Sequence, residues 1–221
     1  MRSTNDNKQN RNRRGVKSGH SVYLRVKRIL DVVISALALL LLWPLMLLIS
    51  LAIKIESKGS VIYVHERVGY QFKPCNIYKF RTMWMDADDM KDNFTAEQKL
   101  EWDQNYKLQN DPRITKVGMI LRRSSADELP QLINVLKGDL SLIGPRPVVA
   151  EELERYGENK EKFVSVMPGL TGYWQAYARN RCSYEERMRM ELEYVENANF
   201  WWDVRIFFAT FVTVLAGKGA C

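Results

Sequence analysis

The sequence predicts an α+β protein that is mostly helical, built from an N-terminal membrane helix and a compact cytoplasmic domain. Three observations support this class: one uncharged apolar run long enough to enter a bilayer, two short segments of β type, and several amphipathic helical segments separated by proline- and glycine-rich loops. The expected units are a polar, basic tail at 1–21, a membrane segment at 22–56 and the cytoplasmic domain at 57–221.

The tail is rich in Asn and Arg and shows no apolar periodicity, which predicts disorder. The 221-residue chain carries a net charge of +7 and has a pI near 9.3. That balance favours an anionic partner, such as nucleic acid, anionic lipid or a phosphorylated small molecule. Three cysteines without a CxxC pair fit a reducing compartment, and two histidines exclude a histidine-rich metal site.

The membrane segment contains the uncharged run VVISALALLLLWPLMLLISLAI at 32–53. Basic residues flank it on both sides, among them Arg25, Lys27, Arg28, Lys54, Lys58 and Arg67. Because positive charge is retained on the cytoplasmic side, both ends of the run are expected to be cytoplasmic. Pro44 in the middle removes a backbone hydrogen bond and bends the helix. Together these features favour a re-entrant helix, broken at Pro44, over a kinked ordinary span.

Beyond the membrane segment, SVIYVHERV at 60–68 and NIYKFRTM at 76–83 are typical of strands, and GYQFKPC between them suits a turn. These segments predict a small β-hairpin. Residues 84–110 are polar and acidic, with helical spacing around Leu100, Trp102 and Tyr106.

In the C-terminal half, SLIGPRPVV at 141–149 is a predicted rigid loop, and VMPGLTGYWQAYARN at 166–180 is another loop-rich stretch. SYEERMRMELEYVENA at 183–198 predicts a helix that a Ser183–Glu186 capping box opens. The last segment is strongly apolar from Phe200 onward. Its aromatic residues suit an amphipathic helix at the membrane interface, and the same pattern suits a buried core helix, so both interpretations stay open.

The stretch LRRSSADELPQL at 121–132 also has two interpretations. In the structural one, Ser125 and Glu128 form a capping box and Pro130 occupies the first turn of a helix. The apolar residues expected to face a core are then Leu129, Leu132, Ile133 and Val135. In the chemical one, adjacent Asp127 and Glu128 form a reactive centre, and the helix dipole keeps Asp127 ionised and nucleophilic.

Fixed cations in the loops favour the chemical interpretation. They are Arg67, Lys79, Arg81, Arg122, Arg123, Arg146 and Arg179. Arg146 stands between two prolines, which suits a guanidinium aimed at a phosphate. Attack of a carboxylate on a pyrophosphate would need such cations and a divalent metal to cancel the negative charge. Mg²⁺ takes one or two carboxylates, and Asp127 and Glu128 supply two.

Other phosphate- and nucleic-acid-binding signatures are missing from the sequence. It contains neither a Walker loop nor a GxGxxG motif. Its basic residues are scattered rather than gathered on one helix face, so nucleic acid is not an expected partner.

A set of motifs follows in fixed order along the chain. They are KRILDVVIS, the proline-broken apolar helix, HERVG, IYKFRTM, NDPRITKVG, SSADELPQLINVLKGDLSLIGPRP, PGLTGYWQ and SYEERMRMELEYVEN. Together they resemble the bacterial sugar transferase family, the monotopic phosphoglycosyl transferases that load a sugar phosphate onto polyprenyl phosphate. The resemblance runs from Tyr23 to Ala220.

The resemblance implies a catalytic domain at 57–221, in which Asp127 attacks the β-phosphate of a nucleotide sugar, usually a UDP-sugar. UMP leaves, and undecaprenyl phosphate then takes the phosphosugar from the carboxylate, which initiates a capsule, exopolysaccharide or O-antigen glycan. Glu128 completes the dyad and, with Asp127, is expected to hold Mg²⁺. Implied substrate contacts are Lys79, Arg81, Arg122, Arg146 and Arg179. The implied location is the bacterial inner membrane, with the active site on its cytoplasmic face and membrane lipids as partners.

Three departures from the family pattern stand out. Trp43 precedes the helix-breaking proline, where a serine hydroxyl commonly bonds the freed carbonyl. AYARN, ending at Arg179 and Asn180, lacks the glycine that many members carry before the arginine, which bears on nucleotide or sugar contacts. The resemblance is to the catalytic part alone of members that also carry a large N-terminal membrane domain.

The alternative is a non-catalytic membrane scaffold of a glycan-assembly complex, although a scaffold has no need of the Asp127–Glu128 pair. The sequence does not rank galactose, glucose or an N-acetylated sugar, and its longer motifs lean slightly toward a hexose. A homodimer is compatible with the sequence.

Overall fold

The computed structural model describes residues 3–105, 108, 111–178 and 182–215. The helices are α1 (Ser3–Glu56), α2 (Ala96–Asn105), α3 (Lys116–Ser124), α4 (Gln131–Lys137), α5 (Ala150–Glu154), α6 (Lys160–Phe163), α7 (Tyr173–Tyr177), α8 (Tyr184–Asn197) and α9 (Phe200–Leu215). The strands are β1 (Ile62–Val68), β2 (Pro74–Phe80), β3 (Ser141–Ile143) and β4 (Gly169–Thr171). Short 3-10 helices are η1 (Tyr70–Phe72), η2 (Asp89–Asn93), η3 (Ala126–Glu128) and η4 (Gly157–Asn159). The mostly helical class with small sheets is confirmed.

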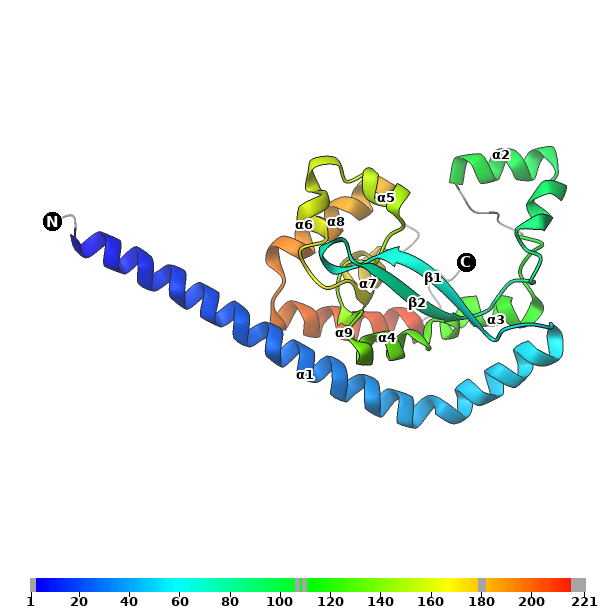
Figure 1. The fold of residues 1–221 in the computed structure, drawn as a ribbon, viewed down its shortest axis with the longest axis horizontal. Coiled ribbons are helices and arrows are strands. Elements are labelled where there is room, and N and C mark those ends of the chain that lie inside the picture. Colours follow the sequence, from blue (N-terminus) through cyan, green and yellow to red (C-terminus); the bar gives the residue numbers. More distant parts are fainter. Residues whose placement is uncertain (1–2, 106–107, 109–110, 179–181, 216–221) are drawn as a thin grey trace.

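Helix α1 contains Pro44 and bends in its C-terminal part as it passes along the base of the body (Figure 1). Its part from Ser21 to Glu56 has 36 residues and, by length and composition, is apolar enough to cross a membrane. The re-entrant course and the break at Pro44 stay predictions. Helix α1 starts at Ser3, and the disorder expected for residues 1–21 also stays a prediction.

Both limbs of α1 are attached to the same body. Before Pro44, Arg28 donates to the carbonyl of Val135 at 2.6 Å, and Asp31 accepts the N–H of Leu142 at 2.9 Å. After Pro44, the carboxylate of Glu56 accepts the first two backbone N–H groups of α3 at 2.7 and 2.9 Å. A charged or polar contact therefore fixes each limb, and both limbs of the bent helix pack against the same domain.

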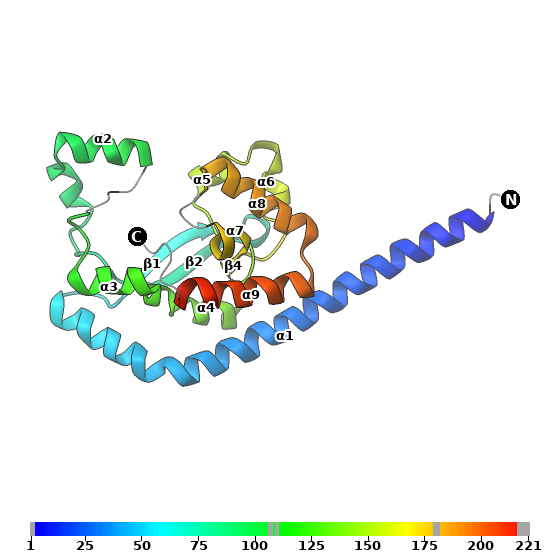
Figure 2. The ribbon, with the colours of Figure 1, turned by 180° about the vertical axis from the view of Figure 1, so that it is seen from behind.

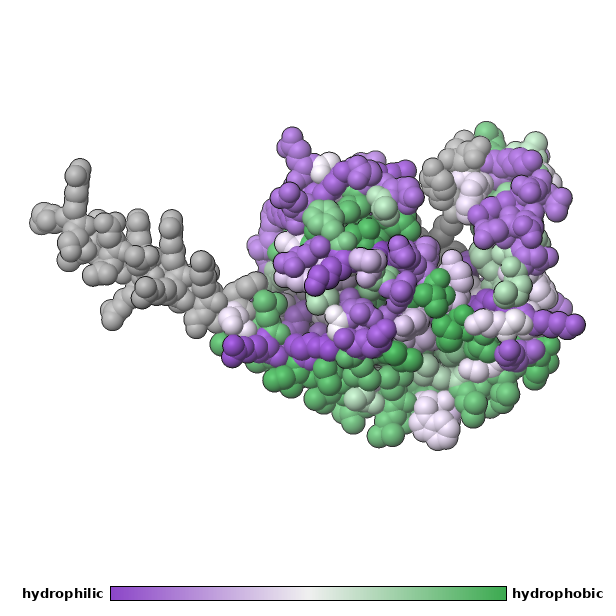
Figure 3. All heavy atoms as spheres, in the orientation of Figure 1, coloured by the Kyte–Doolittle hydropathy of each residue, from purple (hydrophilic) through white to green (hydrophobic). Residues whose placement is uncertain are grey.

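The base of the molecule is apolar. The helices that form the base carry large exposed side chains, which include Leu37, Leu40, Leu41, Trp43 and Leu48 of α1, Ile120 of α3, Ile133 of α4, and Trp201, Phe208, Phe211 and Val212 of α9. Figure 3 shows this apolar border beneath a mostly hydrophilic upper part. Helix α9 lies beside α1 and α4 at the base (Figure 2), with Ile206 fully buried and its other face exposed. Its buried side supports the core-helix interpretation, and the membrane-interface interpretation stays a prediction.

The predicted β-hairpin is confirmed: β1 and β2 pair antiparallel, with Ile62 opposite Phe80. Helix α4 packs on β2 through Asn134, which is fully buried. Its amide oxygen accepts the N–H of Tyr78 at 2.9 Å, and its amide nitrogen donates to the carbonyl of Asn76 at 2.6 Å. The expectation that Ile133 faces the core is wrong, because Asn134 and Val135 occupy the inner face of α4 and leave Ile133 40% exposed.

Two stretches predicted as loops contain the short parallel strands β3 and β4, joined in register from Ser141 to Gly169. Their glycines allow a close backbone approach, since a Cβ on Gly169 would lie 2.1 Å from the backbone nitrogen of Gly144. Periodicity does not show such strands because each has only three residues.

Residues 84–105 form an arm that stands away from the body in both ribbon views (Figures 1 and 2). Helix α2 carries the predicted helical pattern, with Leu100 exposed and Trp102 stacked 4.5 Å from the guanidinium carbon of Arg113. Tyr106, the third residue of that pattern, lies outside the described residues.

Candidate active site

Asp127 and Glu128 lie in η3, in the connection between α3 and α4. Ser125 ends α3 with a left-handed φ of 57°, which reverses the chain and brings the pair alongside β2. The predicted capping box at Ser125 is wrong: its side chain makes no cap, and Glu128 bonds a lysine instead of the backbone. Helix α4 begins only at Gln131, so the two carboxylates precede that helix rather than forming its first turn.

Glu128 is held between two cations. The ammonium of Lys79 donates to its Oε1 at 2.8 Å, and Nη1 of Arg146 lies 3.7 Å from the same oxygen. Burial raises the pKa of Glu128, but Lys79, Arg146 and a hydrogen bond from Gln131 outweigh it, so the net shift is downward. Glu128 is therefore a fixed anion at neutral pH.

Asp127 has the opposite electrostatic character. Burial and the negative charge of Glu128 raise its pKa to about 6, although Lys79 and Arg122 act in the other direction. Asp127 was expected in the first turn of a helix, whereas α4 starts beyond it at Gln131, so burial and Glu128 rather than the dipole of α4 set its pKa. A carboxylate with a pKa just below neutral is ionised at pH 7 and remains basic enough to act as a nucleophile.

A cleft beside Glu128 gathers positive charge and one neutral imidazole. It is lined by His65, Arg67, Ile77, Lys79, Glu128, Gln131, Arg146, Pro147, Gly169 and Leu170. Burial and the surrounding cations lower the pKa of His65 to about 4, so its ring is neutral. Its Nδ1 lies 3.2 Å from Nη2 of Arg67, and because that guanidinium can only donate, the ring proton belongs on Nε2. The cleft thus offers cations and a neutral N–H donor, a combination suited to phosphate oxygens.

His65 and Gln131 line the cleft but were not among the predicted site residues. The signal for His65 was present in the motif HERVG, where alternation along β1 places His65 and Arg67 on the same face. Gln131 follows Pro130, and its place beside Glu128 depends on the turn between η3 and α4, which has no sequence signature.

The remaining predicted substrate contacts are Arg122, Arg81 and Arg179, and the first two contact different parts of the chain. Arg122 lies near Asp127 and donates from Nε to Thr82 at 2.9 Å. Arg81 is buried and donates to the carbonyls of Ser57 and Lys58 at 3.0 and 2.7 Å. It therefore anchors the chain just after α1. Arg179 lies outside the described residues.

The two carboxylates fit a Mg²⁺ ion but not a metal that needs a full protein cage. Within the described part of the chain, no group of three or more His, Cys, Asp or Glu could hold a metal ion. Mg²⁺ needs only one or two carboxylates and keeps water and substrate phosphates as its other ligands. Repulsion from Glu128 contributes to the raised pKa of Asp127, and a bound cation would relieve that repulsion.

The pair lies between two elements of the apolar base. Ile120 on α3 and Ile133 on α4 are both exposed there, 67% and 40% respectively. A reaction at Asp127 would thus take place close to the surface that apolar chains would cover.

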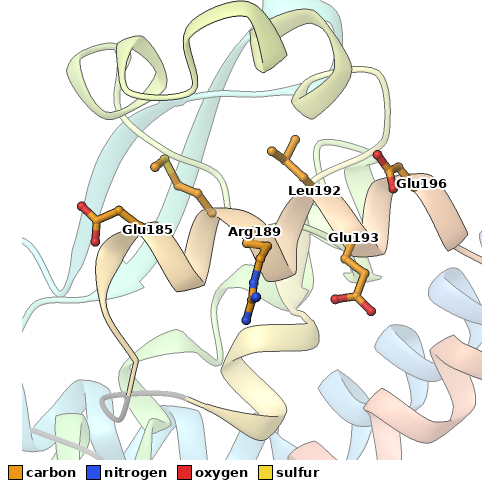
Figure 4. Close-up of a pocket in the computed structure, with 6 residues that line it drawn as sticks. Glu185, Arg189, Leu192, Glu193 and Glu196 are labelled. Carbon is orange, nitrogen blue, oxygen red and sulfur yellow. The ribbon is translucent and has the colours of Figure 1, made fainter.

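Figure 4 shows a second hollow, which lies along α8. Three glutamates line it, namely Glu185, Glu193 and Glu196, together with Met188, Arg189 and Leu192. This predominantly negative surface does not suit a phosphate-bearing ligand, so the cleft beside Glu128 is the better candidate.

A family model and several known proteins match most of this chain. A family model described as "Bacterial sugar transferase" matches residues 22–217. An undecaprenyl-phosphate galactose phosphotransferase from Salmonella typhimurium is 42% identical over 88% of this chain and 41% of its own length. The exopolysaccharide production protein ExoY from Rhizobium meliloti is 42% identical over 88% of this chain and 87% of its own.

A UDP-glucose:undecaprenyl-phosphate glucose-1-phosphate transferase from Escherichia coli is 38% identical over 88% of this chain. This chain spans 41% of the length of the Escherichia coli and Salmonella relatives. The match therefore covers one part of those longer proteins.

Proposed function

This chain belongs to the bacterial sugar transferase family, and from that premise we propose that it transfers a sugar 1-phosphate from a UDP-sugar to undecaprenyl phosphate. The observation that carries the proposal is the setting of the adjacent carboxylates: Lys79 and Arg146 lie 2.8 and 3.7 Å from Oε1 of Glu128, and Arg122 lies near Asp127. In line with this geometry, the pKa of Asp127 is raised to about 6 and that of Glu128 is lowered. The product begins a capsule, exopolysaccharide or O-antigen glycan. Galactose and glucose occur in the names of relatives, which makes them the first donors to test.

The first half-reaction forms a covalent phosphosugar on Asp127. A carboxylate oxygen attacks the β-phosphorus of the donor, and the bond to the oxygen that bridges the α-phosphorus breaks. That oxygen keeps the electron pair, and UMP leaves. In the second half-reaction, a phosphate oxygen of undecaprenyl phosphate attacks the same phosphorus, the bond to Asp127 breaks, and the free carboxylate returns.

Both half-reactions bring anions together, so the surrounding cations are essential. We assign phosphate oxygens to Lys79, Arg122 and Arg146, which lie around the pair, and give Arg81 the anchoring role described above. Asp127 and Glu128 would hold Mg²⁺, which when bound neutralises charge on the diphosphate. The neutral imidazole of His65 adds a donor without further charge.

The shape of α1 supports a re-entrant membrane anchor. A helix that crossed the bilayer completely would carry its two ends to opposite sides, but Arg28 and Glu56 bind the same body from the two limbs. We therefore place both ends and the catalytic domain on the cytoplasmic face of the inner membrane, with the apolar base in the lipid. The phosphate of the lipid acceptor would then lie at the level of Asp127, beside Ile120 and Ile133.

The test is a trapping experiment with purified full-length protein in detergent. The protein is incubated with Mg²⁺ and a panel of UDP-sugars, without lipid phosphate, and its intact mass is measured together with UMP release. We expect the mass of one hexose phosphate to be added to the wild type and to Asp89→Asn, an exposed carboxylate control in the arm. No adduct should form on Asp127→Asn.

The same experiment distinguishes the alternative. An adduct that persists in Asp127→Asn would move the nucleophile elsewhere. Absence of both adduct and UMP release across galactose, glucose and N-acetylated donors would favour a non-catalytic scaffold for glycan assembly.

A further inference from the structure

The segment 144–149, which we call the arginine loop, is fixed from several sides. The N–H of Val68 in β1 donates to the carbonyl of Val148 at 2.8 Å, and β4 holds the carbonyl of Pro145 at 2.9 Å. From a third side, Oε1 of Glu191 in α8 accepts the N–H of Arg146 at 3.2 Å. The first two contacts join backbone to backbone, whereas the third depends on one side chain.

Glu191 is only 1% exposed, which is an unusual place for a carboxylate. Its oxygens serve different groups: Oε1 faces the N–H of Arg146 and the guanidinium of Arg187, the latter at 3.7 Å, and Oε2 accepts the hydroxyl of Tyr156. A buried charge is costly unless it is paired and hydrogen-bonded, and an apolar residue at this position of α8 would avoid that cost. Packing of α8 alone therefore does not explain why a glutamate occupies this position.

A series of ion pairs connects Glu191 to the cleft beside Glu128. Arg187 also lies 3.9 Å from Glu152, and Glu152 lies 3.8 Å from Arg67, which lines the cleft beside His65. Arg187 is stacked 4.6 Å over the ring of Trp174, which restricts its movement. The two guanidinium groups of the cleft are thus connected to one buried charge network, Arg67 through its side chain and Arg146 through its backbone.

We propose that Glu191 is a positioning residue: it fixes the backbone of the arginine loop so that the Arg146 guanidinium, 3.7 Å from Glu128, is presented to a phosphate group of the substrate. The assignment of that anion as a nucleotide diphosphate rests on the proposed function. The geometric part, that Glu191 controls anion binding through Arg146, stands on the contacts alone.

A double-mutant cycle tests the coupling between Glu191 and Arg146. The probe is UDP, whose affinity for the full-length protein in detergent is measured by calorimetry for Glu191→Gln, Arg146→Ala and the double variant. Glutamine keeps the shape of the side chain but has one acceptor oxygen for two donors. We expect Glu191→Gln to weaken UDP binding about tenfold and donor kcat/KM about tenfold to a hundredfold. In the Arg146→Ala background, Glu191→Gln should cause almost no further loss of UDP affinity.

Two further variants make the test specific. Tyr156→Phe removes one partner of Glu191 without altering any charge, and we expect a smaller loss of UDP affinity, about threefold, in the same direction. If Glu191→Gln fails to fold, Tyr156→Phe replaces it in the cycle with Arg146→Ala. Glu193→Gln, an exposed glutamate on the same helix, should bind UDP as the wild type does.

Each outcome decides one claim. Equal, additive losses in both backgrounds, or no loss in Glu191→Gln and Tyr156→Phe, would overturn the positioning role even if the wild type releases UMP from a donor. Coupled losses of UDP affinity in a protein that releases no UMP from any donor would support the positioning role and overturn the proposed function.

Discussion

The ammonium of Lys79 lies 2.8 Å from Oε1 of Glu128, 49 residues further along the chain. This ion pair joins β2 to η3 and explains why two adjacent carboxylates behave differently. Lys79 compensates the buried charge of Glu128 directly, and Arg146 adds to the effect, so Glu128 stays ionised. Asp127 then meets a permanent negative neighbour in a partly buried site, and its pKa rises to about 6.

The first prediction concerns the pH dependence of the donor half-reaction. Because Asp127 must be ionised to attack, kcat/KM for UMP release should rise about tenfold per pH unit below the pKa of Asp127 and level off above it; that pKa is about 6 in the metal-free protein, and Mg²⁺ held by the pair would lower it. In Glu128→Gln the negative neighbour is removed, so the inflection should move to lower pH while the rate falls. An inflection that stays in place in Glu128→Gln would contradict the electrostatic coupling of the pair.

The second prediction concerns stability at the site. The pKa of Asp127 rises from 3.8 to about 6 on folding, so the folded state binds more protons than the unfolded state within that window. The free energy of unfolding contributed by this group therefore falls as pH rises through the window. Asp127→Asn removes the free-energy cost of an ionised carboxylate at this partly buried position and should stabilise the protein by on the order of 1–2 kcal/mol at pH 7.5.

Denaturant unfolding of the wild type and Asp127→Asn at pH 4 and pH 7.5 checks this sign. The stability difference should be large at the higher pH and nearly absent at the lower one. Asp89→Asn provides the exposed control and should show no pH-dependent gain. Destabilisation by Asp127→Asn at pH 7.5 would mean that the carboxylate is a structural cap after all.

The third prediction separates anchoring from substrate binding at Arg81. Its guanidinium donates to the backbone carbonyls of Ser57 and Lys58, and also to the hydroxyl of Ser57 at 2.7 Å. Lysine cannot reproduce this forked contact, so Arg81→Lys should reduce the free energy of unfolding by about 2–3 kcal/mol. UDP affinity of the folded protein should stay unchanged, and Arg123→Lys, at an exposed position, should affect neither quantity. A tenfold loss of UDP affinity in Arg81→Lys would restore its role as a phosphate contact.

The fourth prediction concerns the close approach of α3 to the segment that follows β2. A Cβ on Gly118 would lie 2.1 Å from the carbonyl oxygen of Thr82, so the helix cannot accept a side chain there without moving. Gly118→Ala should destabilise the protein by about 3 kcal/mol or more. Gly157→Ala is the matched comparison, because its φ of 53° is unfavourable for alanine but nothing lies within 4 Å; it should cost about 1 kcal/mol. Equal losses in thermal or denaturant unfolding would show that the helix shifts easily.

The fifth prediction concerns the course of α1. In a background with Cys182 and Cys221 replaced by serine, Arg25→Cys and Lys58→Cys place single exposed thiols before and after the apolar run. In sealed inverted inner-membrane vesicles, both thiols should react with a membrane-impermeant maleimide without permeabilisation. If only one of them reacts before detergent is added, α1 crosses the bilayer and the re-entrant proposal fails.

Part of the candidate site was accessible from residue patterns. Asp127 and Glu128 are adjacent in the sequence, and Arg146 is bracketed by prolines, so their types and spacing already indicated phosphate chemistry. The β-hairpin was predictable because both segments are rich in β-branched and aromatic residues and a turn-forming segment lies between them. The capping box at Ser125 was not reliable, because the same letters are compatible with a left-handed residue that ends one helix.

The long apolar helix with its central proline, the hairpin, and the motif pattern that indicates a sugar transferase could all be predicted from residue order, since each depends on local sequence. Which cation pairs with which carboxylate depends instead on how the elements pack together. Lys79, Arg146 and Glu191 are distant in the chain from Glu128, and their roles depend on distances of a few ångströms between separate elements. Electrostatic effects change strongly over such distances in a partly buried site, so the raised pKa of Asp127 and the anchoring role of Arg81 follow from packing rather than from residue type.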